Sequence, residues 1–121
     1  MVKNQYHIAA PVPEELAQRA AHLINCIRYE GPTKEQKEEL YELIVELTEV
    51  GVDFFFLEPL RRLGAGPVMM KMANMGLNST LKGTRMVIHK VLKRIDNKHL
   101  DGIVDFIEEI LFEPEAYQKA A

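Results

Sequence analysis

Apolar residues recur in this sequence at intervals of three and four, the spacing that places side chains along one side of an α-helix. The clearest series is Leu40, Leu43, Ile44, Leu47 and Val50. On the opposite side of the same helix, in an arc about 100° wide, lie Glu35, Glu38, Glu39, Glu42, Glu46 and Glu49. Thr33 and Gln36 have the spacing of a capping box, and Gly51 is typical of a helix end. We therefore expect an amphipathic helix over residues 34–50.

The same periodicity predicts four further helices. The first covers residues 13–30, because Pro13 suits a first helical turn and Gly31 and Pro32 end the pattern. Gly76 is expected to close a short methionine-rich helix and to separate it from a basic one. The remaining three helices are expected over residues 67–75, 79–95 and 97–112.

Residues 52–66 fit no single pattern. Three successive phenylalanines would cover about 200° of a helix, so one core face rarely accepts all of them. A helix capped by Asp53 and kinked or ended by Pro59 is one interpretation. An irregular apolar segment followed by a short helix from Pro59 to Gly64 is another. A β-strand over residues 54–57 would find no partner strand elsewhere in the chain.

The predicted elements together indicate an all-α fold. Short connections between amphipathic helices favour a small antiparallel helical bundle of four or five helices, with a kinked or broken apolar segment near residues 52–66. The length of 121 residues suits one domain. We expect an N-terminal arm over residues 1–12, a helical domain over 13–113 and a C-terminal tail over 114–121.

Charge is distributed in zones along the chain. Residues 34–50 carry two lysines and six glutamates, whereas residues 67–95 carry six basic side chains and no acidic one. Residues 96–121 are acidic again, with two lysines and seven carboxylates. The candidate basic face comprises Lys82, Arg85, Lys90, Lys93 and Arg94, and the candidate acidic face comprises the six glutamates of residues 34–50. The zones are expected to pair either within one chain or between two chains.

No pattern in the sequence predicts catalysis, a metal site or a cofactor. His22 and Cys26 are neighbours on a helix, but Cys26 lies beside the apolar stripe, where a thiol usually serves as a small hydrophobe. Asp96 and His99 have a spacing that metal sites use, but Asp96 is better explained as a helix cap. The sequence therefore predicts a non-enzymatic protein without a bound cofactor.

A local excess of large apolar residues marks the centre of the chain. It consists of Phe54, Phe55, Phe56, Met69, Met70, Met72 and Met75. Some of them fill a core that has no tryptophan. Methionine also recurs at adaptable binding surfaces. The leading hypothesis is a small helical interaction or regulatory module that binds another protein or forms a homodimer through these residues. The alternative is a carrier or sensor that holds a small apolar ligand of the acyl type between helices.

Nucleic-acid binding through the basic helix 79–95 is a weaker alternative. The layout around Gly76 resembles a helix-turn-helix, but Lys82 and Arg85 stand six and nine residues after that glycine, where the motif needs apolar side chains. The net charge of −3 also disfavours it. The single cysteine and the absence of a signal-peptide pattern or a long apolar run lead us to expect a cytoplasmic protein without a membrane span.

Overall fold

The computed structural model describes residues 4–112, and this part of the chain is helical without any strand. The expectation of an all-α fold is therefore confirmed. The elements in chain order are α1 (Glu14–Glu30), α2 (Lys34–Val52), the π-helical turn η2 (Asp53–Leu57), α3 (Glu58–Arg62), α4 (Pro67–Arg94) and α5 (Asn97–Ile110).

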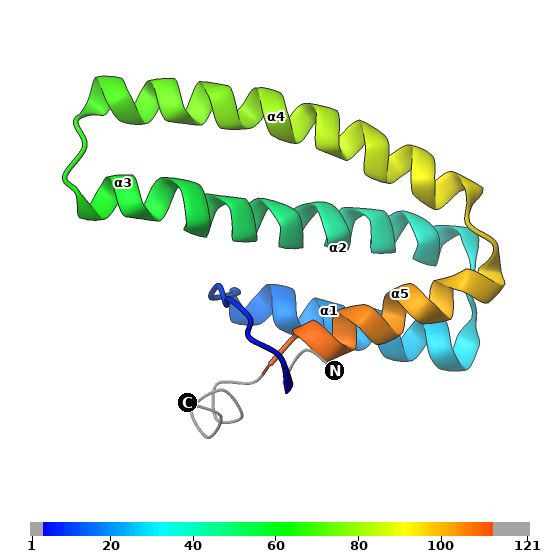
Figure 1. Ribbon diagram of the computed structural model, residues 1–121. Helices are drawn as coiled ribbons and strands as arrows, with labels where there is room; N and C mark the ends of the chain where they lie inside the picture. Colours follow the sequence, from blue (N-terminus) through cyan, green and yellow to red (C-terminus); the bar gives the residue numbers. More distant parts are fainter. Residues whose placement is uncertain (1–3, 113–121) are drawn as a thin grey trace.

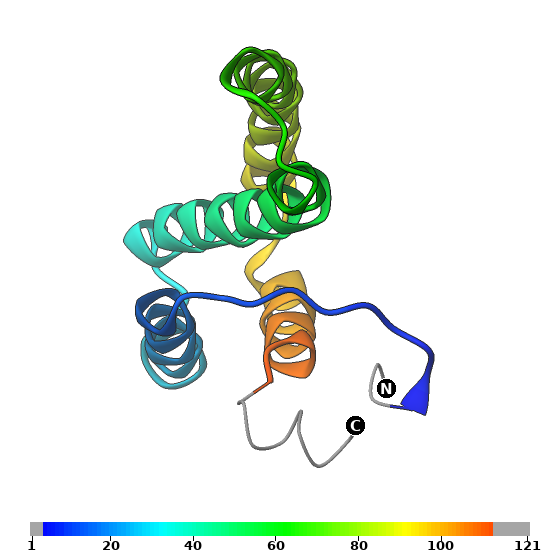
Figure 2. The same ribbon diagram turned by 90° about the vertical axis from the view of Figure 1, so that its left-hand side faces the viewer.

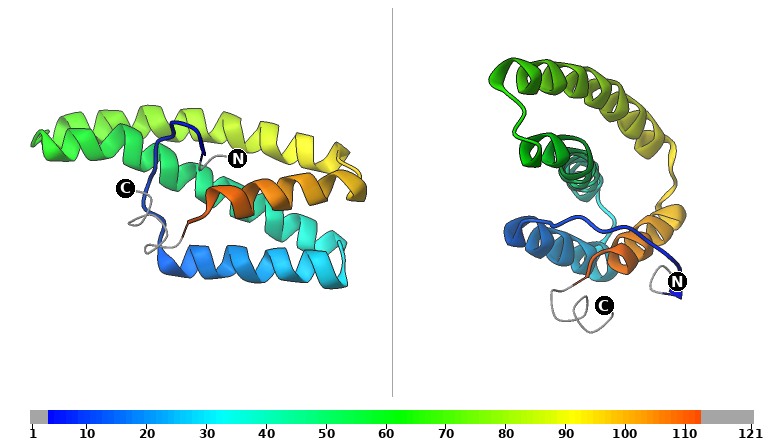
Figure 3. Two further views of the ribbon diagram at one scale, coloured as in Figure 1. Left: turned by 60° about the horizontal axis from the view of Figure 1, so that its bottom comes forward. Right: turned by 60° about the vertical axis from the view of Figure 1, so that its left-hand side comes forward.

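The helices form three layers around α2 (Figure 1). α2, η2 and α3 join into one rod, and α4 runs antiparallel to that rod on one side. α1 and α5 lie next to each other on the other side of α2 (Figures 2 and 3). The far end of the rod and the beginning of α4 extend beyond α1 and α5 (Figure 1). We call this two-helix extension, residues 53–80, the distal hairpin.

The hydrophobic core lies where α1, α2 and α5 meet near the end of α4. It contains side chains that are less than a tenth exposed, namely Leu16, Ala20, Leu23, Ile24, Ile27, Leu40, Leu43, Leu92, Leu100, Val104 and Ile107. Nearly all belong to the stripes that the periodicity predicts, because each helix gains stability by turning its apolar side inward. Leu57 and Leu77 are also buried, but they lie in the distal hairpin outside this cluster.

Gly51 does not end α2, contrary to the sequence prediction. The helix continues through Val52 into the π-helical turn, where the amide of Glu58 donates to the carbonyl of Asp53. Proline lacks an amide hydrogen and its ring collides with the carbonyl four residues earlier in an α-helix. The wider turn of η2 directly before Pro59 reduces that conflict, so the rod passes Pro59 without breaking.

The rod ends at Gly64, as one of the two interpretations predicted. Gly64 has a φ of +74°, in the left-handed region that suits glycine. Its amide donates to the carbonyl of Arg61 at 3.1 Å, and the amide of Ala65 donates to the carbonyl of Leu60 at 3.0 Å. This pair of bonds is a Schellman motif, which satisfies the last carbonyls of the helix. Pro67 then opens α4 at its first position.

α4 is one helix of 28 residues, so the prediction of two helices separated by Gly76 was wrong. Ser79 does not cap a new helix; its hydroxyl donates back to the carbonyl of Met75 at 3.2 Å. Thr80 and Thr84 make the same bond to the carbonyls four residues before them. Glycine costs about 1 kcal/mol inside a helix, and the packing of the long inner side of α4 on the rod outweighs this cost.

Residues near both ends of the described part of the chain pack against the core. α5 ends at Ile110, two residues before the predicted end. Residues 4–12 belong to no long helix, although Val12 packs against the core and the ring of His7 lies 5.9 Å from that of Phe112. The predicted tail over residues 114–121 lies outside the described residues.

Candidate interaction surface

The apolar candidates of the central segment lie in the distal hairpin, where they divide into exposed and half-buried side chains. Phe54 and Met70 are half-buried. The ring of Phe54 meets that of Phe55 edge to face, with centroids 5.5 Å apart. The other five are 46–68% exposed, namely Phe55, Phe56, Met69, Met72 and Met75. The hairpin leaves them uncovered because it consists of two helices only.

The exposed phenylalanines and methionines do not form one patch. Leu57 is 2% exposed in η2, and η2 packs against α4, so Leu57 faces that helix. Phe55, two residues earlier, points roughly to the opposite side of the rod. The exposed methionines of α4 are on the side of α4 that faces away from the rod. We therefore distinguish the phenylalanine pair (Phe55, Phe56) from the outer face of α4.

The outer face of α4 exposes apolar side chains in two groups, over residues 68–75 and 86–91. Its members are Val68, Met69, Met72, Met75, Met86, Val87 and Val91, each 51–75% exposed. The inner side of the same helix carries Leu77, Leu81, Ile88 and Leu92, which are buried or half-buried. α4 is thus apolar on both sides, and the described part of the chain covers only one of them (Figures 1 and 2). Met86 and Val87 were not among the residues predicted from the sequence, because that stretch was interpreted as a basic surface. Val91 was expected on the buried side of the helix, but it is 51% exposed.

The basic face also lies on α4, and all five of its members are exposed. Arg85 forms an ion pair with Glu49 of α2. Lys82, Lys90, Lys93 and Arg94 form no ion pair within residues 4–112. Nearby, the ring of His89 lies against that of Tyr41, with centroids 4.8 Å apart. The basic side of α4 is thus mostly not neutralised by the acidic face of α2.

Two of the six residues of the predicted acidic face form ion pairs with other helices. Glu49 pairs with Arg85, and Glu46 lies 2.6 Å from the guanidinium of Arg19 in α1. The Arg19 guanidinium donates to the Glu46 carboxylate, and this contact together with the negative charge of Glu46 raises the pKa of Arg19 above its ordinary value. The other four, which remain exposed, are Glu35, Glu38, Glu39 and Glu42.

A second cluster of charge joins α1 to α5. The guanidinium nitrogens of Arg28 lie 2.7 Å from the carboxylate of Glu108 and 2.5 Å from that of Asp105. The hydrogen bonds that Arg28 donates to Glu108 and Asp105 raise the pKa of Arg28. The acidic C-terminal zone is therefore partly balanced by an arginine of the first helix rather than by the basic helix.

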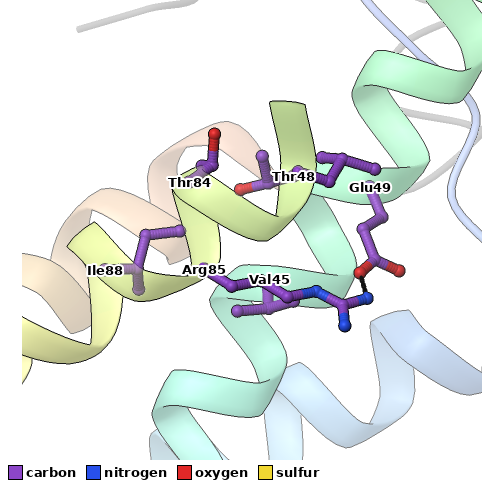
Figure 4. A pocket seen from close by; sticks show the side chains of 7 residues that line it. Val45, Thr48, Glu49, Thr84, Arg85 and Ile88 are labelled. Carbon is purple, nitrogen blue, oxygen red and sulfur yellow. Dashed lines mark hydrogen bonds and ion pairs between the residues drawn. The ribbon is translucent and has the colours of Figure 1, made fainter. Parts of the chain in front are cut away.

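Side chains fill the seam between α2 and α4. Figure 4 shows Arg85 reaching across it to Glu49, with Val45 and Ile88 at the base of the contact. Leu81 and Thr84 of α4 and Thr48 of α2 complete the lining. Their side chains leave no enclosed space of the size an acyl chain needs.

The remaining candidates among the described residues are the groups considered for catalysis and metal binding. The sulfur of Cys26 lies 3.6 Å from Nε2 of His22, and the sequence predicted that proximity. Asp96 precedes α5, and its carboxylate lies 3.9 Å from the ring of His99. Over residues 4–112 no three histidine, cysteine or acidic side chains are grouped as metal ligands. None of the described helices is long and apolar enough to cross a membrane.

The most distinctive surface of the molecule is therefore the outer face of α4, flanked by basic side chains. Comparison of the chain with protein-family models, with curated proteins and with solved structures finds no match in any of the three.

Proposed function

We propose that this protein is a small interaction or regulatory module that associates with a second copy of itself through the outer face of α4. The observation that carries the proposal is the exposure of seven valine and methionine side chains along one helix, each 51–75%. A helix that is apolar on both sides is usually covered on both sides. Monomeric proteins rarely expose a contiguous apolar patch of more than a few hundred Å².

The arrangement of the helices supports the same proposal. The distal hairpin has no third helix, so α4 is covered there on the side of the rod only (Figure 1). Association along α4 would remove apolar surface from water, and this is the main driving force for forming a protein interface.

The proposal includes no reaction and no bound small molecule. Among the described residues, His22 has no hydrogen bond to a third group that would orient its imidazole, as activation of a nucleophile requires. An apolar ligand has no enclosed space in the seam between α2 and α4. The experiment below nevertheless distinguishes a ligand carrier from a self-associating protein.

The proposal is tested by native mass spectrometry together with light scattering after size exclusion, from low to high micromolar concentration. The expected result is a species of twice the 13.9 kDa chain mass that dissociates on dilution. A monomer at every concentration would refute self-association. A monomer that retains a few hundred extra daltons would instead support the carrier.

Two double variants and a control locate the interface. Met69→Ser with Met72→Ser is expected to weaken the dimer, because both side chains are more than half exposed on the outer face of α4. Phe55→Ser with Phe56→Ser is expected to change it little, because the phenylalanine pair lies on another side of the hairpin. Phe106→Ser in α5 is the control, since Phe106 is 55% exposed and distant in sequence from α4.

A further inference from the structure

Eight exposed positions of α4 form two series with a spacing of seven residues, although only three of the eight residues are apolar. Met69, Gly76, Gly83 and Lys90 are spaced by seven, and Met72, Ser79, Met86 and Lys93 form a second series three residues later. This is the a and d spacing of a coiled coil. All eight residues are exposed, whereas Leu77, Leu81, Ile88 and Leu92 of the same helix are buried or half-buried.

The middle of this repeat consists of small residues. A Cβ atom added to Gly76 or to Gly83 would meet nothing within 4 Å, so no contact inside the chain requires a glycine at either position. Each nevertheless costs about 1 kcal/mol of helix stability relative to alanine. Ser79 lies between them with its hydroxyl bonded back to Met75. The centre of the outer face thus exposes helix backbone, whereas methionines project on both sides of it.

We infer that the occupant of this face is the α4 helix of a second copy, packed antiparallel at close range. This inference rests on the proposed self-association and adds its geometry. A two-fold axis near residues 77 and 78 places Gly76 opposite Ser79 of the other copy, so that the backbones can approach closely. The same register places Met72 opposite Gly83 and Met69 opposite Met86. The large side chain of each helix then enters the space left by a small one.

Charge selects the antiparallel direction. Lys71 is the one charged residue in the first half of α4, whereas the second half carries five basic residues and no acidic one. A parallel pair would place these five beside the same five of the other copy. In the antiparallel register, Lys82 and Arg85 lie beside the nearly uncharged half of the other α4. The other three basic residues lie beyond its first residue, Pro67, so the repulsion of the parallel arrangement is avoided. Opposed helix dipoles favour the same direction.

The available area suits a stable dimer. In the proposed register the two α4 helices overlap over residues 67–88, so the seam extends over about 33 Å. Six of the seven exposed valines and methionines lie in this stretch, and at roughly 100 Å² each they amount to about 600 Å². Specific interfaces take about 600–1,000 Å² from each partner.

Cysteine cross-linking tests the direction and the register. Cys26→Ser removes the native thiol, and Ser79→Cys or Lys90→Cys then adds one thiol on the outer face of α4. Near the axis, the two copies of residue 79 would be offset by about 5 Å along the helices, and those of residue 90 by about 38 Å. Only the first separation allows a disulfide. Mild oxidation is therefore expected to link Ser79→Cys dimers and to leave Lys90→Cys dimers unlinked.

The outcomes separate the two proposals. A dimer by light scattering that links at both positions is parallel, and one that links at neither uses another surface; each would overturn the antiparallel seam and leave self-association intact. A protein that stays monomeric would refute both proposals together.

A substitution at Gly83 provides an independent test. Gly83→Leu adds a side chain whose Cβ has open space within its own chain, but the side chain would fill the space taken by Met72 of the other copy. We expect helical content to be unchanged and the dimer dissociation constant to rise by about tenfold or more. Gly102→Leu in α5 is the matched control, because Gly102 also has open space around its Cβ position. An equal dissociation constant for Gly83→Leu and the unsubstituted protein would overturn the proposed packing.

Discussion

Arg85 of α4 forms an ion pair with Glu49 of α2, and within residues 4–112 it is the one basic side chain of α4 that does so. The acidic α5 is balanced instead by Arg28 of α1. The alternating charge zones of the sequence are therefore not a simple intramolecular match between α4 and its neighbours. Most of the positive charge of α4 remains available to influence association.

The Arg85–Glu49 pair is expected to contribute little to stability. Both side chains are partly solvated, with 52% and 31% exposure, and such pairs typically contribute about 0–1 kcal/mol. Arg85→Met, Glu49→Gln and the double variant form a double-mutant cycle that urea unfolding can measure. A coupling energy well above 1 kcal/mol would show that the seam is a stronger electrostatic contact than its exposure indicates.

Thr33 is expected to be an important local determinant of α2. Its hydroxyl accepts from the amide of Gln36 at 3.2 Å, and the side chain of Gln36 accepts from the amide of Thr33 at 2.9 Å. Removing the first bond by Thr33→Ala is expected to lower the free energy of unfolding by about 0.5–2 kcal/mol. Thr33→Ser keeps the hydroxyl and should change it much less. Equal losses from the two variants would contradict a capping role.

Two glycines of the rod are expected to respond to alanine with opposite signs. Gly64→Ala places a side chain at φ +74° and should destabilise the protein by about 1 kcal/mol or more. Gly51 lies inside α2, and a Cβ added there has open space around it. Gly51→Ala should therefore stabilise the protein by about 0.5–1 kcal/mol. Thermal unfolding of both variants measures the two changes in stability. If α2 ended at Gly51, Gly51→Ala would not stabilise the protein.

The distal hairpin is expected to open before the core unfolds. Leu43 is 1% exposed and belongs to the core cluster, so Leu43→Ala should cost about 2–5 kcal/mol of global stability. Leu57 is equally buried but lies outside that cluster. Leu57→Ala should therefore accelerate amide hydrogen exchange mainly in residues 53–80. The measurement is made at a concentration where the protein is monomeric. Uniform acceleration along the chain would indicate one cooperative unit instead.

The sequence by itself determined the features that depend on near neighbours in the chain. The cap at Thr33 and the apolar stripe of α2 each arise from residues within one or two turns. The end at Gly64 is also local, but it was one of two interpretations that the sequence left open. Periodicity also determined the all-α class, because an apolar stripe at helical spacing can be buried only by another element. The proximity of Cys26 and His22 was predictable for the same local reason.

Only the tertiary structure decided where α2 and α4 continue through their glycines. Gly51 and Gly76 are equally compatible with a helix end, and the loss of about 1 kcal/mol at each is small beside the packing that the longer helices gain. The tertiary structure also decided which apolar side chains remain exposed to solvent. The methionines of α4 lie on both sides of one helix, and since the rod covers one side only, Met72 is exposed while Leu77 is buried. Which side is covered depends on contacts between distant parts of the chain, and a local pattern does not contain that information.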